Sequence, residues 1–209
     1  MFNRLRKYAF RARYYPSLPE GWLSKYQAEE LYRMGRENPG PFLEIGSWIG
    51  RSTCCIAYGI RASGKYKRFV SVDLGIASED EWQAFFGQPL AKKPNKDLYL
   101  PHINRPGGSI ESLKENLRTR KLDHLVEVRK GDFRKMEWGS EQFETIFCDV
   151  SHNPREVAAN IPGIVDLLQP GGTLVADDIR TPEILKTLLD HFPCKEHRVK
   201  EQMFIGRKA

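Results

Sequence analysis

The sequence predicts an α/β fold with a mainly parallel, seven-stranded sheet, helices on both faces and an antiparallel hairpin at the carboxyl end. Short apolar runs of strand length alternate with segments of helical length along most of the chain. This order is typical of βαβ units, whose crossover helices cover both faces of a parallel sheet. With 209 residues, of which 40% are hydrophobic, the chain is long enough to bury the core of one domain.

The elements follow one another in a regular order. Apolar residues between Ser24 and Glu37 predict a first helix, which the sequence Asn38-Pro39-Gly40-Pro41 ends. Leucines at 113 and 117 share one face of another helix. Strands are predicted at 42–45, 69–74, 126–128, 143–150 and 173–177, helices at 53–60, 109–120, 155–168 and 182–191, and the hairpin strands at 197–199 and 203–205.

Residues 1–20 are predicted to form a basic arm and linker ahead of a single domain at 21–209. Residues 1–15 contain five basic and no acidic side chains, so they carry five of the six net positive charges. Phe2, Leu5, Ala9 and Ala12 have helical spacing, which favours a short amphipathic helix, although a solvated arm fits equally well. The segment 15–19 is expected to be an extended linker. Such an arm could contact nucleic acid, acidic lipid or a partner subunit.

One long segment interrupts the alternation of strands and helices. Residues 75–108 contain Trp82, Phe85, Phe86, Tyr99 and four prolines, without a clear period. A stretch of this length is usually a functional lid or a disordered insertion, and its aromatic residues argue against disorder. We therefore expect it to cover the substrate.

The cysteines and the hydropathy indicate a cytoplasmic protein. Cys54, Cys55, Cys148 and Cys194 form no C-x-x-C pair, and three of them lie in segments expected to be buried. Free thiols of this kind favour a reducing compartment. The sequence has no run of eighteen apolar residues, and its first residues do not have the pattern of a secretory signal.

A first group of candidate ligand-binding residues follows the first strand. In open α/β sheets, ligands bind beyond the carboxyl ends of the strands. Gly46 and Gly50 allow a tight turn and close packing, Ser47 lies between them, and Ser52 lies at the start of a helix, where an anion is favoured. The carboxylate of Glu44 could bind an ammonium group. Together these features match a zwitterionic amino acid.

The next strand end supplies an acidic residue. Asp73 follows the second strand and could accept hydrogen bonds from two ribose hydroxyls. Trp48 occupies the place of the second glycine of a G-x-G-x-x-G motif, where a pyrophosphate needs close approach to the backbone. A nicotinamide cofactor is therefore disfavoured.

Three further acids end neighbouring strands. Asp149 follows the fourth strand, and Asp177 and Asp178 follow the fifth. Converging carboxylates favour a hard cation such as Mg²⁺, which would orient a substrate oxygen and lower its pKa. His152 is a candidate general base, with a structural or helix-capping role as the alternative.

The spacing E-x-G-x-x-x-G-x-S at 44–52, with the acids after successive strands, resembles class I (Rossmann-like) methyltransferases that depend on S-adenosylmethionine (SAM). The resemblance spans roughly residues 40–206 and is to the catechol and macrocin O-methyltransferases and the cephalosporin-hydroxylase-like families. It implies that Asp132 binds the adenine amino group while Phe133 flanks the ring, with a helix-capping turn as the alternative for Asp132. It also implies a catalytic lysine at the position of His152, so the chain departs from the catechol enzymes there. The predicted cofactor-binding set is Glu44, Gly46, Ser47, Gly50, Ser52, Asp73, Asp132, Phe133 and Asp149. The predicted metal ligands are Asp149, Asp177 and Asp178, and the predicted catalytic residues are Asp149 and His152.

The predicted function is SAM-dependent, metal-assisted methylation of a hydroxyl group on a small acceptor, such as a sugar, an antibiotic-type scaffold or an aromatic compound. Arg155 and Arg180 are candidates for binding an acidic acceptor. The alternatives are an RNA-modifying methyltransferase that uses residues 1–15, and a non-catalytic SAM-binding module. The arm or the hairpin could also mediate a homo-oligomer.

Overall fold

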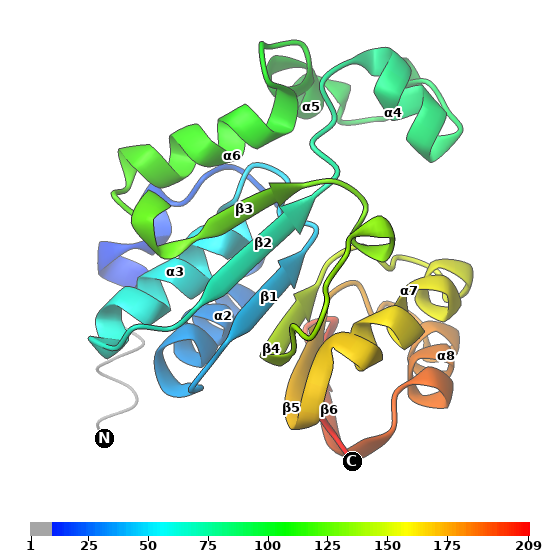
Figure 1. The fold of residues 1–209 in the computed structure, drawn as a ribbon. Coiled ribbons are helices and arrows are strands. Elements are labelled where there is room, and N and C mark those ends of the chain that lie inside the picture. The colour runs from blue at the N-terminus through cyan, green and yellow to red at the C-terminus, as the bar shows by residue number, and fades with distance from the viewer. Residues whose placement is uncertain (1–9) are drawn as a thin grey trace.

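A seven-stranded sheet forms the centre of the computed structural model, which describes residues 10–209 (Figure 1). The strand order is β3-β2-β1-β4-β5-β7-β6. Strands β1 to β5 pair in parallel with one another, and β7 is antiparallel to both β5 and β6, which confirms the predicted sheet and hairpin. The strands are β1 (Phe42–Ile45), β2 (Phe69–Asp73), β3 (Glu127–Lys130), β4 (Phe143–Cys148), β5 (Leu168–Ala176), β6 (Cys194–Lys200) and β7 (Met203–Lys208).

Helices cover both faces of this sheet (Figure 1). One layer contains α2 (Lys25–Glu37), α3 (Arg51–Ser63) and α6 (Gly108–Thr119), and the other contains α7 (Pro154–Leu167) and α8 (Pro182–His191). Successive side chains of a strand point to opposite faces. In β1, Phe42 accordingly packs with α2 and α3, whereas Leu43 and Ile45 pack with α7 and α8.

Local signals in the sequence set the starts of the helices. The Ser24 hydroxyl accepts a hydrogen bond from the Gln27 amide while the Gln27 side chain accepts one from the Ser24 amide, and this capping box begins α2. Asn153 caps α7 and Thr181 caps α8, each followed by a proline, which suits the first helical turn. These signals explain why the predicted helix bounds agree with the structure to within a few residues.

The described part of the amino-terminal arm packs on the domain. Residues 10–13 are helical, and a 3-10 turn, η1 (Tyr15–Ser17), stands where an extended linker was expected. The buried Phe10 ring stacks on Tyr32, and Tyr14 stacks on Tyr58, so aromatic contacts with α2 and α3 favour the compact turn. The predicted apolar positions 2, 5 and 9 lie outside the described residues.

The insertion at 75–108 is ordered. It contains α4 (Glu79–Phe86), η2 (Leu90–Lys92) and α5 (Lys96–Ile103), which stand beyond the carboxyl ends of β2 and β3 (Figure 1). It has a small core of its own, formed by Ile76, Trp82, Leu90 and Ile103. Its role as a substrate cover stays a prediction.

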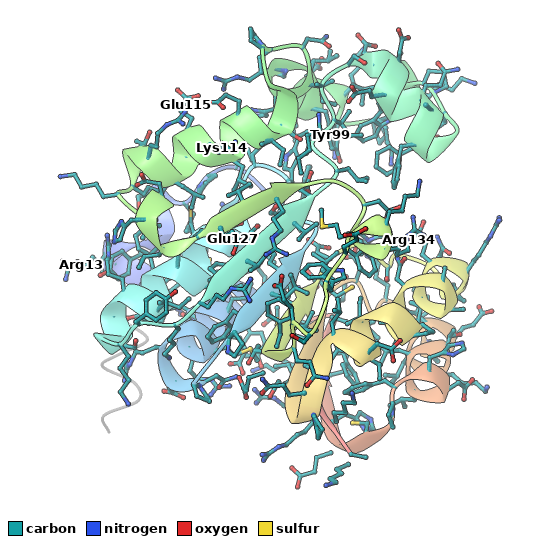
Figure 2. The ribbon with its side chains drawn as sticks, in the orientation of Figure 1. Arg13, Tyr99, Lys114, Glu115, Glu127 and Arg134 are labelled. Carbon is teal, nitrogen blue, oxygen red and sulfur yellow. The ribbon has the colours of Figure 1, made fainter. Side chains whose placement is uncertain are left out.

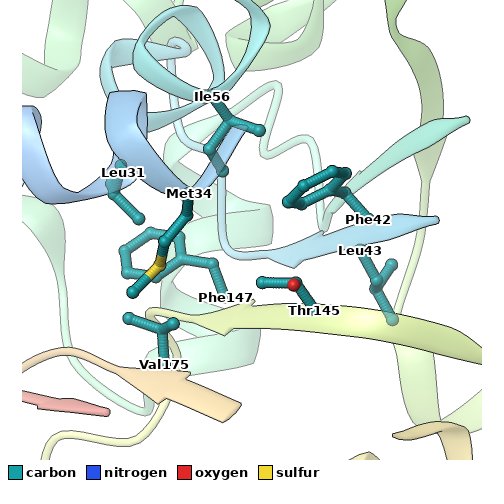
Figure 3. Close-up of a pocket in the computed structure, with 8 residues that line it drawn as sticks. All are labelled: Leu31, Met34, Phe42, Leu43, Ile56, Thr145, Phe147 and Val175. Carbon is teal, nitrogen blue, oxygen red and sulfur yellow. The ribbon is translucent and has the colours of Figure 1, made fainter. Parts of the chain in front are cut away.

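The main core is tightly filled. A small cavity lined by Leu31, Met34, Phe42, Leu43, Ile56, Thr145, Phe147 and Val175 lies between α2, α3 and the sheet (Figure 3). Its volume of about 10 Å³ is near that of one water-sized probe and its lining is almost wholly apolar. It is therefore a packing gap and not a candidate binding site.

Two remaining short turns are η3 (Asp123–Leu125) and η4 (Phe133–Lys135). Cys54, Cys55 and Cys148 are buried and all four cysteines are free, as the sequence predicted. Within residues 10–209, none of the helices has the length and hydropathy that crossing a membrane requires.

Candidate active site

The two glycines of the loop between β1 and α3 adopt backbone conformations that favour glycine. Gly46 has φ +90° and Gly50 has φ +94°. A Cβ atom on Gly46 would lie 2.5 Å from the carbonyl oxygen of Asp149, and one on Gly50 would lie 2.5 Å from Cδ1 of Leu113. The glycines therefore bring the loop against the end of β4 and against α6. Packing of its own helix on the strand is the role predicted for Gly50, whereas the neighbour at this position is Leu113 of α6.

Glu44 is fully buried in β1 and faces α3. Its Oε2 accepts hydrogen bonds from Thr53 Oγ1 at 2.6 Å and from Ser71 Oγ at 2.8 Å, whereas its Oε1 has no hydrogen-bond partner among the described residues. Burial raises the pKa of Glu44 to about 7, an effect that the neighbouring hydroxyls partly offset. A cationic ligand at Oε1 would favour the ionised carboxylate.

The loop before α3 and the first turn of that helix offer further polar groups. Ser47 is 2% exposed, and its hydroxyl has no hydrogen-bond partner within the described part of the chain. Ser52 is buried in the first turn of α3, where backbone amides point out of the helix. A buried polar atom without a partner is costly unless a ligand satisfies it. Glu44, Ser47 and the start of α3 thus fit an amino acid with its ammonium and carboxylate groups.

Asp73 ends β2 beside this loop. Its Oδ2 accepts a hydrogen bond from the Trp48 amide at 2.8 Å, and its Oδ1 accepts one from the Gly75 amide at 2.9 Å. Burial raises the pKa of Asp73, and these amide contacts oppose the rise. The carboxylate therefore holds the loop in place, and it retains acceptor capacity for a ribose hydroxyl.

Asp132 and Phe133 follow β3. Asp132 caps η4 through the Arg134 amide and forms a two-point ion pair with the Arg134 guanidinium, which holds the pKa of Asp132 below its usual range. The capping alternative is therefore present in the structure. Phe133 is 6% exposed and lies in the core on the α7 side, so its contact with adenine stays a prediction. Figure 2 shows Arg134 on the turn η4, beside α7.

A compact group of possible metal ligands lies at the ends of β4 and β5. Asp149, His152 and Asp178 each place a ligand atom within 4.8 Å of the others. His152 Nδ1 is 2.7 Å from Asp178 Oδ2, and Arg180 donates a hydrogen bond to Asp178 Oδ1 at 2.6 Å. Two carboxylates and an imidazole form a donor set that suits a divalent cation.

Asp177 does not belong to this group. Its Oδ1 accepts a hydrogen bond from Gln27 Nε2 of α2 at 2.5 Å and another from the Asp178 amide at 2.9 Å. The structure therefore brings together Asp149 and Asp178 of the expected ligand set and adds His152. Sequence reasoning missed the contact with Gln27, because the capping-box spacing locates the start of α2 but not its position over the sheet.

The electrostatics of the group depend on burial and on mutual contacts. Burial and the charge of Asp177 raise the pKa of Asp149, and burial raises the pKa of Asp177 to about 6. For Asp178 burial acts in the same direction, but His152 and Arg180 outweigh it and hold the pKa low. The hydrogen bond to Asp178 raises the pKa of His152. Arg180 thus contacts the acidic group directly, whereas Arg155 is exposed at the start of α7.

The strand order and the acid-lined edge of the sheet define a class I methyltransferase fold. Comparison with known families supports this: the model of a family described as a methyltransferase domain matches residues 43–179. The chain belongs to this methyltransferase-domain family, and the resemblance to class I SAM-dependent methyltransferases is confirmed. No curated protein sequence matches the chain.

Solved structures share the fold at low sequence identity. An O-methyltransferase from Bacillus cereus, in complex with S-adenosylhomocysteine (SAH), has a TM-score of 0.57 and 18% identity over 97% of this chain and 89% of its own. TomG from Streptomyces achromogenes, an O-methyltransferase of tomaymycin synthesis in complex with SAM, has a TM-score of 0.57 and 18% identity. The match covers 98% of this chain and 88% of TomG. An RNA methyltransferase from Salinibacter ruber, in complex with SAH, has a TM-score of 0.51 and 15% identity. The match covers 90% of this chain and 92% of that methyltransferase.

Proposed function

We propose that this methyltransferase transfers the methyl group of SAM to a hydroxyl group of a small-molecule acceptor. The group formed by Asp149, His152 and Asp178 carries the proposal, because it lies directly beside the loop that fits the amino-acid part of SAM. Gly46 of that loop packs on the backbone of Asp149. A donor in the loop and an acceptor at the acids would therefore meet in a short, fixed geometry, which is the main requirement for methyl transfer.

The donor site is assigned to residues at three strand ends. Glu44 binds the ammonium group, Ser47, Ser52 and the start of α3 bind the carboxylate, and Asp73 binds the ribose hydroxyls. Asp132 and Phe133 remain assigned to the adenine. The O-methyltransferases among the structural neighbours, two of them complexes with SAM or SAH, support this choice of donor.

The acceptor hydroxyl is assigned to the other half of the site. His152 donates a hydrogen bond from Nδ1 to the Asp178 carboxylate. This arrangement leaves Nε2 of His152 to take the hydroxyl proton. Asp149 and Asp178, with His152 beside them, have the donor chemistry to hold a divalent cation such as Mg²⁺. A bound cation would lower the pKa of the acceptor hydroxyl. Asp177, which faces α2, supports the site through Gln27.

Calorimetric titration with SAM, with and without Mg²⁺, tests the proposal. We expect micromolar binding, and a Mg²⁺ effect that Asp178→Ala abolishes. Asp190→Ala, which removes an exposed aspartate of α8, is the matched control and should behave as the parent protein. Equal SAM affinity with and without Mg²⁺ would remove the cation from the proposal and leave His152 as the base. Absence of SAM binding would refute the proposed function.

The basic arm favours a second candidate, an RNA-modifying methyltransferase. Residues 1–15 carry five basic side chains, and one structural neighbour is an RNA methyltransferase. Deletion of residues 1–9 tests this candidate, since it removes Arg4, Arg6 and Lys7 but keeps the packed Phe10. Salt-dependent RNA binding that the deletion abolishes would support RNA as the acceptor. Equal RNA binding before and after deletion would exclude this role of the arm.

A further inference from the structure

Three tryptophan side chains, from three different parts of the chain, meet around Tyr99 of α5. The Tyr99 ring centroid lies 5.5 Å from that of Trp22, 5.2 Å from that of Trp48 and 5.0 Å from that of Trp82. We call these four residues the aromatic wall. The rings of Trp22 and Tyr99 are stacked with an angle of 26° between their planes, whereas Trp82 meets Tyr99 edge-on.

The aromatic wall borders both halves of the proposed active site. Trp48 belongs to the loop after β1, and its amide donates a hydrogen bond to Asp73. Trp22 precedes Ser24, which caps α2, and Gln27 in the first turn of the same helix binds Asp177. Figure 2 shows Tyr99 between α5 and the carboxyl ends of the strands. The wall therefore runs from the donor loop to the helix that supports the acidic group.

One end of the wall is anchored and the other is open. Trp82 is 4% exposed and lies in the small core of the insertion, whereas Trp22 is 56% exposed. Next to Trp82, the rings of Phe85 and Phe86 are also exposed. Exposed aromatic rings that gather at the edge of a site are typical of a ligand-binding surface. Stacking on Tyr99 holds the Trp22 ring in place without covering it.

We propose that the aromatic wall binds the methyl acceptor and that this acceptor presents a ring with an apolar face. The proposal rests on the proposed function and assigns its substrate class. The wall side chains carry no charge, and indole and phenol rings favour flat apolar partners, which include aromatic rings and the CH-rich faces of sugars. An acceptor ring stacked on this wall would lie beside the donor loop, whose Gly46 packs on the backbone of Asp149.

Fluorescence and calorimetric titrations of the SAH-loaded protein test this surface with two probes, catechol and methyl β-glucopyranoside. We expect one of the probes to bind and to quench tryptophan emission, because Trp22 and Trp48 would lie against it. Catechol binding identifies an aromatic acceptor, and glucopyranoside binding identifies a sugar. Removal of one stacking ring, in Trp22→Ala or Tyr99→Ala, should weaken binding roughly tenfold.

Three controls separate stacking from damage to the fold. Tyr99→Phe keeps the ring and should bind the probe as the parent protein does. Tyr66→Ala removes a ring that is 91% exposed and precedes β2, at the opposite end of the strands, and should also have no effect. SAH titration of each variant reports on the donor site separately. The proposal would be overturned if Trp22→Ala and Tyr99→Ala bind SAH normally and bind the probe as tightly as the parent protein. Failure of both probes to bind the parent protein at millimolar concentration would also overturn it.

Discussion

Replacement of Glu44 by glutamine should make the protein less sensitive to pH. The pKa of Glu44 is raised from its usual 4.5 to about 7, first of all by burial. The folded state therefore binds the proton more tightly than the unfolded state does. The resulting stabilisation is fully present below pH 4.5 and is lost as the pH rises through 7.

The magnitude follows from the two pKa values. At 1.36 kcal/mol for each pKa unit, Glu44 should lower the free energy of unfolding by about 2 to 3 kcal/mol between pH 5 and pH 8. The glutamine that replaces it cannot ionise, and its amide oxygen can still accept the hydrogen bonds that Thr53 and Ser71 donate to Glu44. The variant should therefore match the parent near pH 4 and exceed it in stability at pH 8, while it binds SAM more weakly because the ammonium group loses a carboxylate.

Urea unfolding of parent and variant at pH 5, 6, 7 and 8 measures the difference directly. Comparison of the two proteins at each pH largely removes the titration of Asp149 and Asp177, which both share. Glu137→Gln, which neutralises an exposed glutamate, is the control and should parallel the parent. Parallel curves for Glu44→Gln and the parent would show that Glu44 has an ordinary pKa and would refute this account of its burial.

Two further substitutions test the packing of α2. A Cβ on Gly59 of α3 would overlap the Tyr32 carbonyl oxygen and lie 3.0 Å from Gly35 Cα. Gly59→Ala should therefore lower the free energy of unfolding by about 3 kcal/mol. A urea midpoint equal to that of the parent protein would contradict this close helix contact. Lys67 donates hydrogen bonds to three carbonyl oxygens at the end of α2, at 2.5 to 2.9 Å. Lys67→Met should therefore cost about 1 to 3 kcal/mol in the same assay, whereas the exposed Lys65→Met should cost little, and equal effects would argue against the cap.

The succession of strands and helices along the chain, and the parallel sheet with its terminal hairpin, followed from the sequence because the local signals agree. Apolar runs, caps and glycine turns each indicate the same elements, and buried strands of this kind leave few alternatives for the sheet. The helices of the insertion did not follow. Residues 75–108 lack a regular apolar period, because they pack on one another around Trp82 and not along one face of a large sheet. Tyr99 of the insertion also packs against Trp22 and Trp48, which are distant in sequence.

In the acidic site, sequence spacing did not predict which carboxylates come together. Asp177 and Asp178 are adjacent, so the sequence placed both carboxylates at one ligand site, but side chains at the end of a strand continue its alternation. Val175 packs on the α2 side and Ala176 on the α7 side, so Asp177 points back toward α2 and reaches Gln27. Asp178, at φ +63°, turns the other way and meets His152. The residue that joins Asp149 and Asp178 is His152, which follows β4 by four positions and whose loop returns to the same edge.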